Sequence, residues 1–391
     1  MGGGLMQLVA YGAQDIYLTG NPQITFFKVV YRRHTNFSME LIEQTWNGST
    51  TANGRCTATI SRNGDLVNSM FLDVAGTPGT TSNPGSDFIK TVEIEIGGQK
   101  IDKHSGKWME VWSELTESNQ NGTVGDTKAT SAAALGTRFQ RMSGMGGVIG
   151  TAAPGRHWVP LQFWFCRNPG LALPLIALQY HEVKVILEHV FTGVFSGAQV
   201  HNKLWAEYIY LDTDERRRFA QVSHEYLIEQ VQEISLTTAV GSKDLNFNHP
   251  VKELVWASST AAEGTDNSTQ LIVPGTAGTT TFQLKLNGHD RFAVQPLHYF
   301  SRTQVWQYHT GAGLNSAAAG TGSLFNDSIC VYSFALKPEE HQPSGTCNFS
   351  RIDNAQLVVA GAAMGDNPHV YAVNYNVLRI MSGMGGLAYS N

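Results

Sequence analysis

Few residues in this sequence are of the kind that usually carries chemistry. The four cysteines, Cys56, Cys166, Cys330 and Cys347, are far apart, and no two of them form a CxxC pair. This spacing excludes the common zinc and redox motifs and indicates free thiols in a reducing compartment. No run of 18 apolar residues occurs, so the sequence predicts no transmembrane helix. The N-terminus lacks a basic segment followed by an apolar one, so we expect no secretory signal peptide.

Charge is scarce as well. Asp, Glu, Lys and Arg make up 15% of the 391 residues, and the net charge is −5. Such a chain has no basic field to attract nucleic acid, so we expect no direct contact with a genome. Aromatic residues make up 10%, which is not the composition of a disordered chain. The 40 glycines, among short apolar runs, suggest many strands joined by turns, over a length that suits two domains.

Sequence motifs for catalysis or metal binding are also missing. The chain has no GxSxG, no GxxxxGK[ST], no HExxH, and no two His one residue apart. Asp212 and Asp214 form a DxD pair, which we interpret as a solvated linker. We therefore predict no enzyme, no cofactor and no metal site. Two other classes stay open: a glycan-binding module that uses Trp46 or Trp256 as stacking platforms, and a jelly-roll hydrolase.

An internal repeat is the main positive signal. The letters LIEQ occur at residues 41–44 and again at residues 227–230, 186 residues later. Arginines precede both copies: Arg32 and Arg33 come before the first, and Arg216, Arg217 and Arg218 before the second. Because they occur in both repeats, we interpret these arginines as structural residues that pair with acidic neighbours across an interface.

Further matches follow in the same order. Residues 91–96 and 281–286 alternate apolar and polar residues, as strands do, and end at Gly97-Gly98 and Asn287-Gly288, typical hairpin turns. Residues 107–118 then predict an amphipathic helix, with apolar residues at positions 108, 111, 112 and 115. Pro296 suggests a comparable helix in the second half, where Trp306 lies near the position that corresponds to Trp112.

The remaining strands are predicted less directly. Asn63-Gly64 suggests a hairpin within residues 57–73, residues 163–165 open a strand, and residues 175–188 form a strand pair. Residues 332–334 are the counterpart of 163–165, and residues 371–377 alternate as a last strand. We predict an all-β fold of two tandem eight-stranded antiparallel jelly-roll barrels with short helical insertions. The expected divisions are an arm at 1–25, a first domain at 26–212 and a second at 213–391.

Two surface features complete the predictions. Residues 1–25 carry apolar residues broken by glycines, which we interpret as an arm that docks on a neighbour or a membrane-facing partner. The alternative is a segment packed along its own domain. Among six Asn-x-Ser/Thr sites, Asn121 and Asn267 lie in predicted loops and are the best candidates for glycosylation, although chance explains such sites in a chain rich in Ser and Thr.

Longer stretches resemble a known family. The start, GGGLMQLVAYGAQDIYLTGNPQITFFKVVYRRHTNFSMELIEQTWNG, resembles the major capsid proteins of nucleocytoplasmic large DNA viruses, in the algal-virus and giant-virus branch. So do SRNGDLV at 61–67, PLQFWFCRNPGLALPLIALQYHEVKV at 160–185, and the ending NVLRIMSGMGGLAYSN.

The resemblance implies a structural role in a virion. It implies a double jelly-roll chain that forms homotrimers, with six barrels per pseudo-hexagonal capsomer, in an icosahedral shell around an internal membrane. The implied partners are neighbouring capsomers, minor capsid or cement proteins and penton proteins, with the membrane reached through the arm or the minor proteins. Assembly would take place in the host cytoplasm. No catalytic residue is implied.

Overall fold

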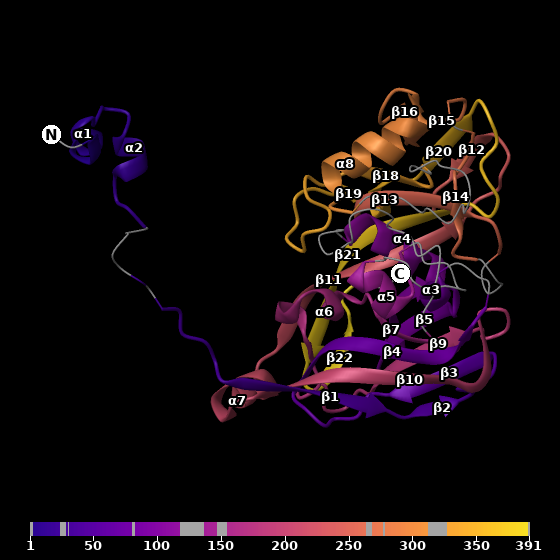
Figure 1. Ribbon diagram of the computed structural model, residues 1–391, viewed down its shortest axis with the longest axis horizontal. Coiled ribbons are helices and arrows are strands. Elements are labelled where there is room, and N and C mark those ends of the chain that lie inside the picture. The colour runs from indigo at the N-terminus through magenta and orange to yellow at the C-terminus, as the bar shows by residue number, and fades with distance from the viewer. Residues whose placement is uncertain are drawn as a thin grey trace. The chain divides into compact units, whose positions relative to one another are not determined.

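The computed structural model describes residues 3–23, 29, 31–79, 83–117, 137–146, 155–262, 268–276, 278–311 and 327–389. The chain divides into two compact units, residues 1–36 and residues 37–391. The first unit contains two short helices, α1 (Gly3–Val9) and α2 (Ile16–Thr19), and no residue of either helix is buried (Figure 1). The predicted domain boundaries at residues 25 and 212 stay predictions.

Two facing sheets form a first barrel. In the described residues its strands are β1 (Phe37–Gln44), β2 (Trp46–Gly48), β3 (Gly54–Thr59), β4 (Leu66–Pro78), β5 (Ile89–Ile96), β6 (Gln99–Ser105), β7 (Arg156–Pro160), β8 (Leu173–Pro174), β9 (Val183–His189) and β10 (Phe195–Leu211). One sheet has the order β1-β10-β4-β7, and the other has the order β2-β3-β9-β5-β6.

A second barrel repeats this arrangement. Its strands are β11 (His224–Ser235), β12 (Gly241–Asp244), β13 (Pro250–Ser259), β14 (Leu271–Ile272), β15 (Thr281–Leu286), β16 (His289–Asp290), β17 (Gln295–Pro296), β18 (Ile329–Ser333), β19 (Cys347–Asn348), β20 (Ala355–Ala360), β21 (His369–Met381) and β22 (Met384–Leu387). One sheet places β11, β21, β13 and β18 side by side, and the other has the order β12-β20-β15-β16.

The two barrels therefore have the same strand order. Strands β1, β10, β4 and β7 correspond to β11, β21, β13 and β18, and strands β3, β9, β5 and β6 correspond to β12, β20, β15 and β16. Each barrel is an antiparallel jelly roll, so the predicted double jelly roll is confirmed. The LIEQ repeat lies on the matching strands β1 and β11, and both copies have the same register. Leu41 to Gln44 face residues 207 to 204, and Leu227 to Gln230 face residues 377 to 374.

Short helices connect the strands. They are α3 (Pro84–Asp87), α4 (Gly106–Thr116), α5 (Arg138–Ser143), α6 (Trp164–Arg167), η2 (Pro169–Leu171), α7 (Thr213–Gln221), the π-helical η3 (Tyr299–Gln304), α8 (Val305–Tyr308) and η4 (Phe349–Arg351). The predicted helix after the first hairpin is confirmed as α4. The Ser105 side chain caps it by accepting a hydrogen bond from the Trp108 backbone N–H.

Each barrel has an apolar core, the first of which extends to Ile228, Leu378 and Ile380 of the second barrel, and a third cluster also joins the barrels. The third cluster contains Trp108, Val111, Trp112 and Leu115 of α4, and it packs them against apolar residues of β13, β18 and β21. Figure 1 shows α4 beside these strands. Strand β21 is consequently buried on both faces: Val370 and Ala372 belong to the second barrel's core, while Tyr371 and Val373 face α4.

Some local predictions are wrong. The turn at Asn63-Gly64 does not join a hairpin, because β3 and β4 lie in different sheets. Gly64 lies against the buried Tyr208 side chain at the crossing between the sheets, which explains why a glycine is needed there. Residues 163–165 enter helix α6 instead of a strand, since an aromatic run can be buried in either structure. The predicted strand pair at 175–188 is also wrong, because β8 ends before this range, β9 begins only at Val183, and the two strands lie in different sheets.

The hairpins at Gly97-Gly98 and Asn287-Gly288 are confirmed. Strand β5 pairs with β6 and β15 with β16 across these turns. Gly97, Gly98 and Gly288 have positive φ, which explains the glycines. The second helix begins after β17, which includes Pro296, so the proline precedes the helix without starting it. No helix among the described residues is both long and apolar enough to cross a membrane.

Candidate functional site

The contact between the two barrels is the most elaborate site in the described part of the chain. Strand β6 is the last strand of its sheet, and β11 is the first of its own. The Gln230 side-chain amide donates to the carbonyl of Ile101, and the Val231 backbone N–H donates to Asp102 Oδ1 at 3.2 Å. The other oxygen, Asp102 Oδ2, is 2.9 Å from Nε2 of the buried His104. These bonds satisfy polar groups along two strand edges and hold the edges together.

Above this edge contact, helix α4 covers the outer face of the second barrel. The ring of Trp108 lies 5.0 Å from that of Tyr371 and 5.5 Å from that of Trp112. Both tryptophans are at most 4% exposed. Because a buried Trp removes a large apolar area from water, α4 is a major apolar anchor between the barrels.

Next to α4 is a buried cluster of ionised side chains. Glu229 of β11 forms ion pairs with Lys252 Nζ at 2.8 Å and with Arg167 of the first barrel at 3.1 Å. The Arg167 guanidinium also stacks on Trp112, 4.8 Å from the ring centre. Burial by itself would raise the pKa of Glu229, but Arg167, His341 and Lys252 outweigh it and lower this pKa to about 2. Glu229 is therefore a permanent carboxylate that joins the two barrels.

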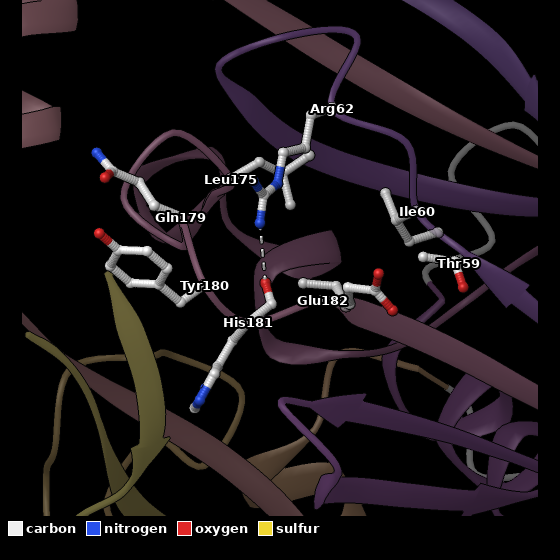
Figure 2. Close-up of a pocket in the computed structure, with 9 residues that line it drawn as sticks. Thr59, Ile60, Arg62, Leu175, Gln179, Tyr180, His181 and Glu182 are labelled. Atoms are coloured by element: carbon white, nitrogen blue, oxygen red, sulfur yellow. Dashed lines mark hydrogen bonds between the residues drawn. The ribbon is translucent and has the colours of Figure 1, made fainter. Parts of the chain in front are cut away.

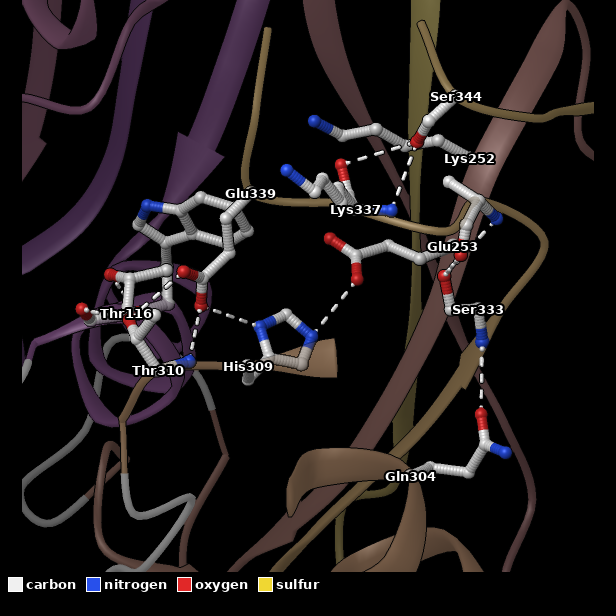
Figure 3. A network of polar contacts seen from close by, with 12 residues as sticks. Thr116, Lys252, Glu253, Gln304, His309, Thr310, Ser333, Lys337, Glu339 and Ser344 are labelled. Carbon is white, nitrogen blue, oxygen red and sulfur yellow. Dashed lines mark hydrogen bonds and ion pairs between the residues drawn. The ribbon is translucent and has the colours of Figure 1, made fainter. Parts of the chain in front are cut away.

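Figure 3 shows His309 between two other carboxylates of this cluster. Its Nδ1 is 3.0 Å from Glu339 Oε1 and its Nε2 is 3.0 Å from Glu253 Oε2. Burial tends to lower the pKa of His309, but Glu253 and Glu339 raise it to about 9. His309 is therefore a cation that donates from both ring nitrogens at neutral pH.

The same segment fastens the end of α8 to the end of α4. The Thr310 hydroxyl donates to the Thr116 carbonyl at 3.0 Å, and the Gly311 N–H donates to the Leu115 carbonyl at 2.7 Å. Thr310 also donates from its backbone N–H to Glu339, at 2.9 Å. Every polar contact of this network serves to position backbone or to neutralise charge. None of it resembles a nucleophile beside a base.

A separate hollow of about 360 Å³ beside Arg62 is lined by both polar and apolar residues (Figure 2). The Arg62 guanidinium donates to the carbonyls of Leu178 and His181, at 2.5 and 3.3 Å. His181 Nδ1 is 2.9 Å from the carbonyl oxygen of Gly385, in the last strand of the second barrel. The residues that line the hollow all belong to the first barrel, and His181 joins its rim to the second. In the described part of the chain, no group of three or more His, Cys, Asp or Glu could hold a metal ion.

The predicted arginines do not form two equivalent sites. Arg32 and Arg33 lie in an exposed non-helical segment before β1, whereas Arg216, Arg217 and Arg218 lie in helix α7. Arg216 Nε donates to Asp65 Oδ1 at 2.8 Å, an ion pair within the chain. Whether any of the five takes part in an interface stays a prediction. The glycosylation candidates Asn121 and Asn267 lie outside the described residues.

Two other sequence interpretations can be compared with the structure. Trp256 is not a glycan platform, because it is 1% exposed and packs against Phe282 and Phe300 in the second core. Trp46 is half-buried. The Asp212 side chain accepts from the Thr213 N–H at the start of α7, and Asp214 lies in the first turn, where the helix dipole favours a carboxylate.

Comparison with known proteins identifies the family. The model of the major capsid protein N-terminus matches residues 25–212, and the model of the large eukaryotic DNA virus major capsid protein matches residues 215–386. The chain belongs to the major capsid proteins of large eukaryotic DNA viruses. This confirms the resemblance seen in the sequence, and it agrees with the prediction that the protein is not an enzyme, because its relatives are structural capsid proteins.

The relatives cover the whole capsid chain. The major capsid protein of Pyramimonas orientalis virus is 52% identical, and that of Paramecium bursaria Chlorella virus 1 is 40% identical, each over 100% of both chains. The crystal structure of PBCV-1 VP54 matches with a TM-score of 0.74 and 36% identity, over 94% of this chain and 100% of that chain. The Faustovirus major capsid protein, at 13% identity and a TM-score of 0.64, shares the fold over 95% of this chain and 94% of its own.

The sequence interpretation missed the buried ionic cluster of this capsid protein. Glu229 was visible only as part of the repeat, and Arg167 only as part of the family resemblance. One signal was available: Lys252 and Glu253 stand together inside the apolar strand 250–259, where ionised residues are expected only when they are paired. The partners of such residues come from distant segments and cannot be read from local spacing.

Proposed function

We propose that three copies of this chain form a pseudo-hexagonal capsomer that tiles the icosahedral shell of a large DNA virus. The observation that carries the proposal is the repeat of one jelly roll with one strand order in a single chain. Three such chains contribute six barrels, which make a six-cornered block with only a threefold axis. The likeness to the chain in the PBCV-1 virus capsid model, with a TM-score of 0.74 and 36% identity, supports the same role.

The junction between the barrels suits this role. A capsomer that tiles a shell needs a fixed angle between its two barrels, because each barrel occupies one corner. Helix α4 and the ion pair of Arg167 with Glu229 both span the junction, so a change of angle would expose apolar area and separate buried charges. This supports a chain that acts as a rigid building block.

The partners in a virion follow from the same proposal. They are neighbouring capsomers, minor capsid or cement proteins and penton proteins. The arm, with α1 and α2, would dock on a neighbour or a membrane-facing partner, since Tyr17 and Leu18 are 89% and 84% exposed. Assembly in the host cytoplasm fits the four cysteines, all of which are free thiols.

The test is the native mass of the purified protein, measured by light scattering. A trimer has a mass of about 128 kDa, three times the 42.7 kDa of the chain. Because association over a large interface depends on concentration, the mass is measured over a dilution series. A folded chain that stays at the monomer mass at the highest concentration would contradict the capsomer proposal.

A further inference from the structure

The contact between the barrels joins unlike surfaces of two like units. The first barrel contributes β6, α4 and Arg167, and the second barrel contributes β11 and the outer faces of β13 and β21. Because the barrels share one strand order, each of these strands has a counterpart in the other barrel, and a helix follows the matching hairpin in both. A contact of this kind uses one surface of each barrel and leaves the complementary surface of each barrel unused, so it can repeat from chain to chain until a ring closes.

The unused surface of the first barrel centres on β1, which corresponds to β11. In the described part of the chain, β1 pairs with β10 alone, so its other edge is open. Phe37, Met39 and Leu41 are 53%, 45% and 40% exposed on this edge strand. An open strand edge with a row of apolar side chains is a surface that proteins usually cover. We call it the β1 surface.

The unused surface of the second barrel is formed by the counterparts of β6, α4 and α6. These are β16, the helix η3–α8, and the residues that follow β18. Trp306 on α8 is 84% exposed, whereas Trp112 on α4 is 4% exposed under the second barrel. Leu336, after β18, is 75% exposed. We call this the α8 surface, with Trp306, Leu336 and Lys337 as its defining residues.

Each of the two surfaces carries one exposed charge of opposite sign near the place of an internal ion pair. Glu43 occupies the same place in the LIEQ repeat as Glu229, which receives Arg167 from the first barrel. The Glu43 side chain is 44% exposed and accepts a hydrogen bond from Lys203 Nζ at 3.1 Å, in an ion pair on the same sheet that is exposed to solvent and therefore contributes little. An Asn-Pro pair follows β7 and a Lys-Pro pair follows β18, so Lys337 matches Asn168, which is the neighbour of Arg167. The Lys337 side chain is 65% exposed and forms an exposed ion pair with Glu340 at 2.7 Å, which it would exchange for Glu43 at the contact.

We propose that the β1 surface of one copy binds the α8 surface of a second copy, with Trp306 and Leu336 covering the apolar row and Lys337 facing Glu43. This contact would reproduce between chains the contact that already exists within the chain. The proposal rests on the capsomer function above and names the surfaces that close its ring.

The test is a pair of charge reversals, Glu43→Lys and Lys337→Glu, each alone and then combined. Like charges at the contact repel, so each single variant is expected to raise the concentration at which the trimer dissociates by at least tenfold. The combined variant restores opposite charges and is expected to recover at least half of the wild-type trimer at a concentration where the single variants are monomers. Light scattering over a dilution series measures all three, and circular dichroism checks that each chain is folded.

Lys90 and Glu188 provide the matched control. They form an exposed cross-strand ion pair at 3.3 Å, on β5 and β9, outside both surfaces. Lys90→Glu and Glu188→Lys should leave the trimer unchanged. A wild-type trimer that persists in both single variants of Glu43 and Lys337 would overturn the inference while leaving the capsomer function intact. Single variants that dissociate without recovery in the combined variant would also overturn the pairing. A monomeric wild-type chain would overturn both proposals.

Discussion

The imidazole of His309 is 3.0 Å from the Glu253 carboxylate, and both side chains are completely buried between the barrels. A charged histidine in such a place must be stabilised by its partners, since burial opposes the charge. Its pKa of about 9 is well above the ordinary 6.5 because Glu253 and Glu339 both accept from the ring. Charge at this junction therefore depends on pH in the alkaline range, which is unusual for a histidine.

The first prediction concerns alkaline pH. The pKa of His309 is raised on folding, so its stabilising contribution is complete below about pH 6.5 and is lost as pH rises through about 9. We expect the free energy of unfolding to fall over that range, by roughly 3 kcal/mol at most. Urea unfolding at a series of pH values measures it. The buried thiols, whose pKa is also raised by burial, add a fall of their own near pH 9, and the lowered pKa of Lys252 acts in the opposite direction. The contribution of His309 is therefore the difference between the wild type and His309→Gln, in which the fall should be smaller. An equal fall in both would contradict the assignment.

The second prediction concerns Glu229. Glu229→Gln removes the counter-charge of Lys252, whose side chain is fully buried, and of Arg167. Leaving a buried cation without its partner should destabilise the fold by about 3–5 kcal/mol. The control is Glu188→Gln, in an exposed pair, which should cost less than about 1 kcal/mol. Thermal unfolding measures the stability of both variants. Equal losses of stability would show that the buried cluster contributes no more than a surface ion pair.

The third prediction separates the arginines of α7. Arg216 pairs with Asp65, whose side chain is only 4% exposed and which also accepts from the Leu211 N–H. Arg216→Ala should therefore destabilise the fold by about 1–3 kcal/mol, because a mostly buried carboxylate loses its cation. Arg217→Ala, in the same exposed helix, keeps helix propensity matched and should change stability by less than about 0.5 kcal/mol. Chemical unfolding of the two variants compares them, and a stronger effect of Arg217 would contradict the ion pair.

The architecture could be predicted from the sequence, whereas most side-chain contacts between the barrels could not. The LIEQ repeat and the hairpins at Gly97-Gly98 and Asn287-Gly288 depend on local chemistry, and the structure places them on matching strands. The turn at Asn63-Gly64 has the same local chemistry, yet it crosses between sheets, because the jelly roll decides which strands pair. The contacts of Arg167 with Glu229 and of His309 with Glu253 join segments dozens of residues apart, and no spacing rule predicts them.

The fourth prediction concerns helix α4. Trp108→Ala removes a buried indole that contacts Tyr371 and leaves a cavity between the barrels. We expect a loss of about 3–5 kcal/mol in the free energy of unfolding. Tyr389→Ala, at a residue that is 64% exposed, removes an aromatic ring without a cavity and should have little effect. If α4 contributed no buried contact to the second barrel, calorimetry would give the same loss in the free energy of unfolding for both substitutions.

The fifth prediction concerns the arm. Removing residues 1–25 should leave the barrels folded, because residues 37–391 form a compact unit with its own cores. Assembly of the shell should be impaired, since the apolar side chains of α1 and α2 would no longer be available to a partner. Circular dichroism and the native mass measure folding and trimer formation, and electron microscopy of co-expressed capsid components measures assembly.

The double substitution Leu8→Ser and Leu18→Ser keeps the length of the arm and removes two exposed apolar side chains, at 79% and 84% exposure, so it should impair assembly as the deletion does. Loss of folding in the deletion variant would instead make the segment part of the first barrel, as the alternative interpretation of residues 1–25 requires.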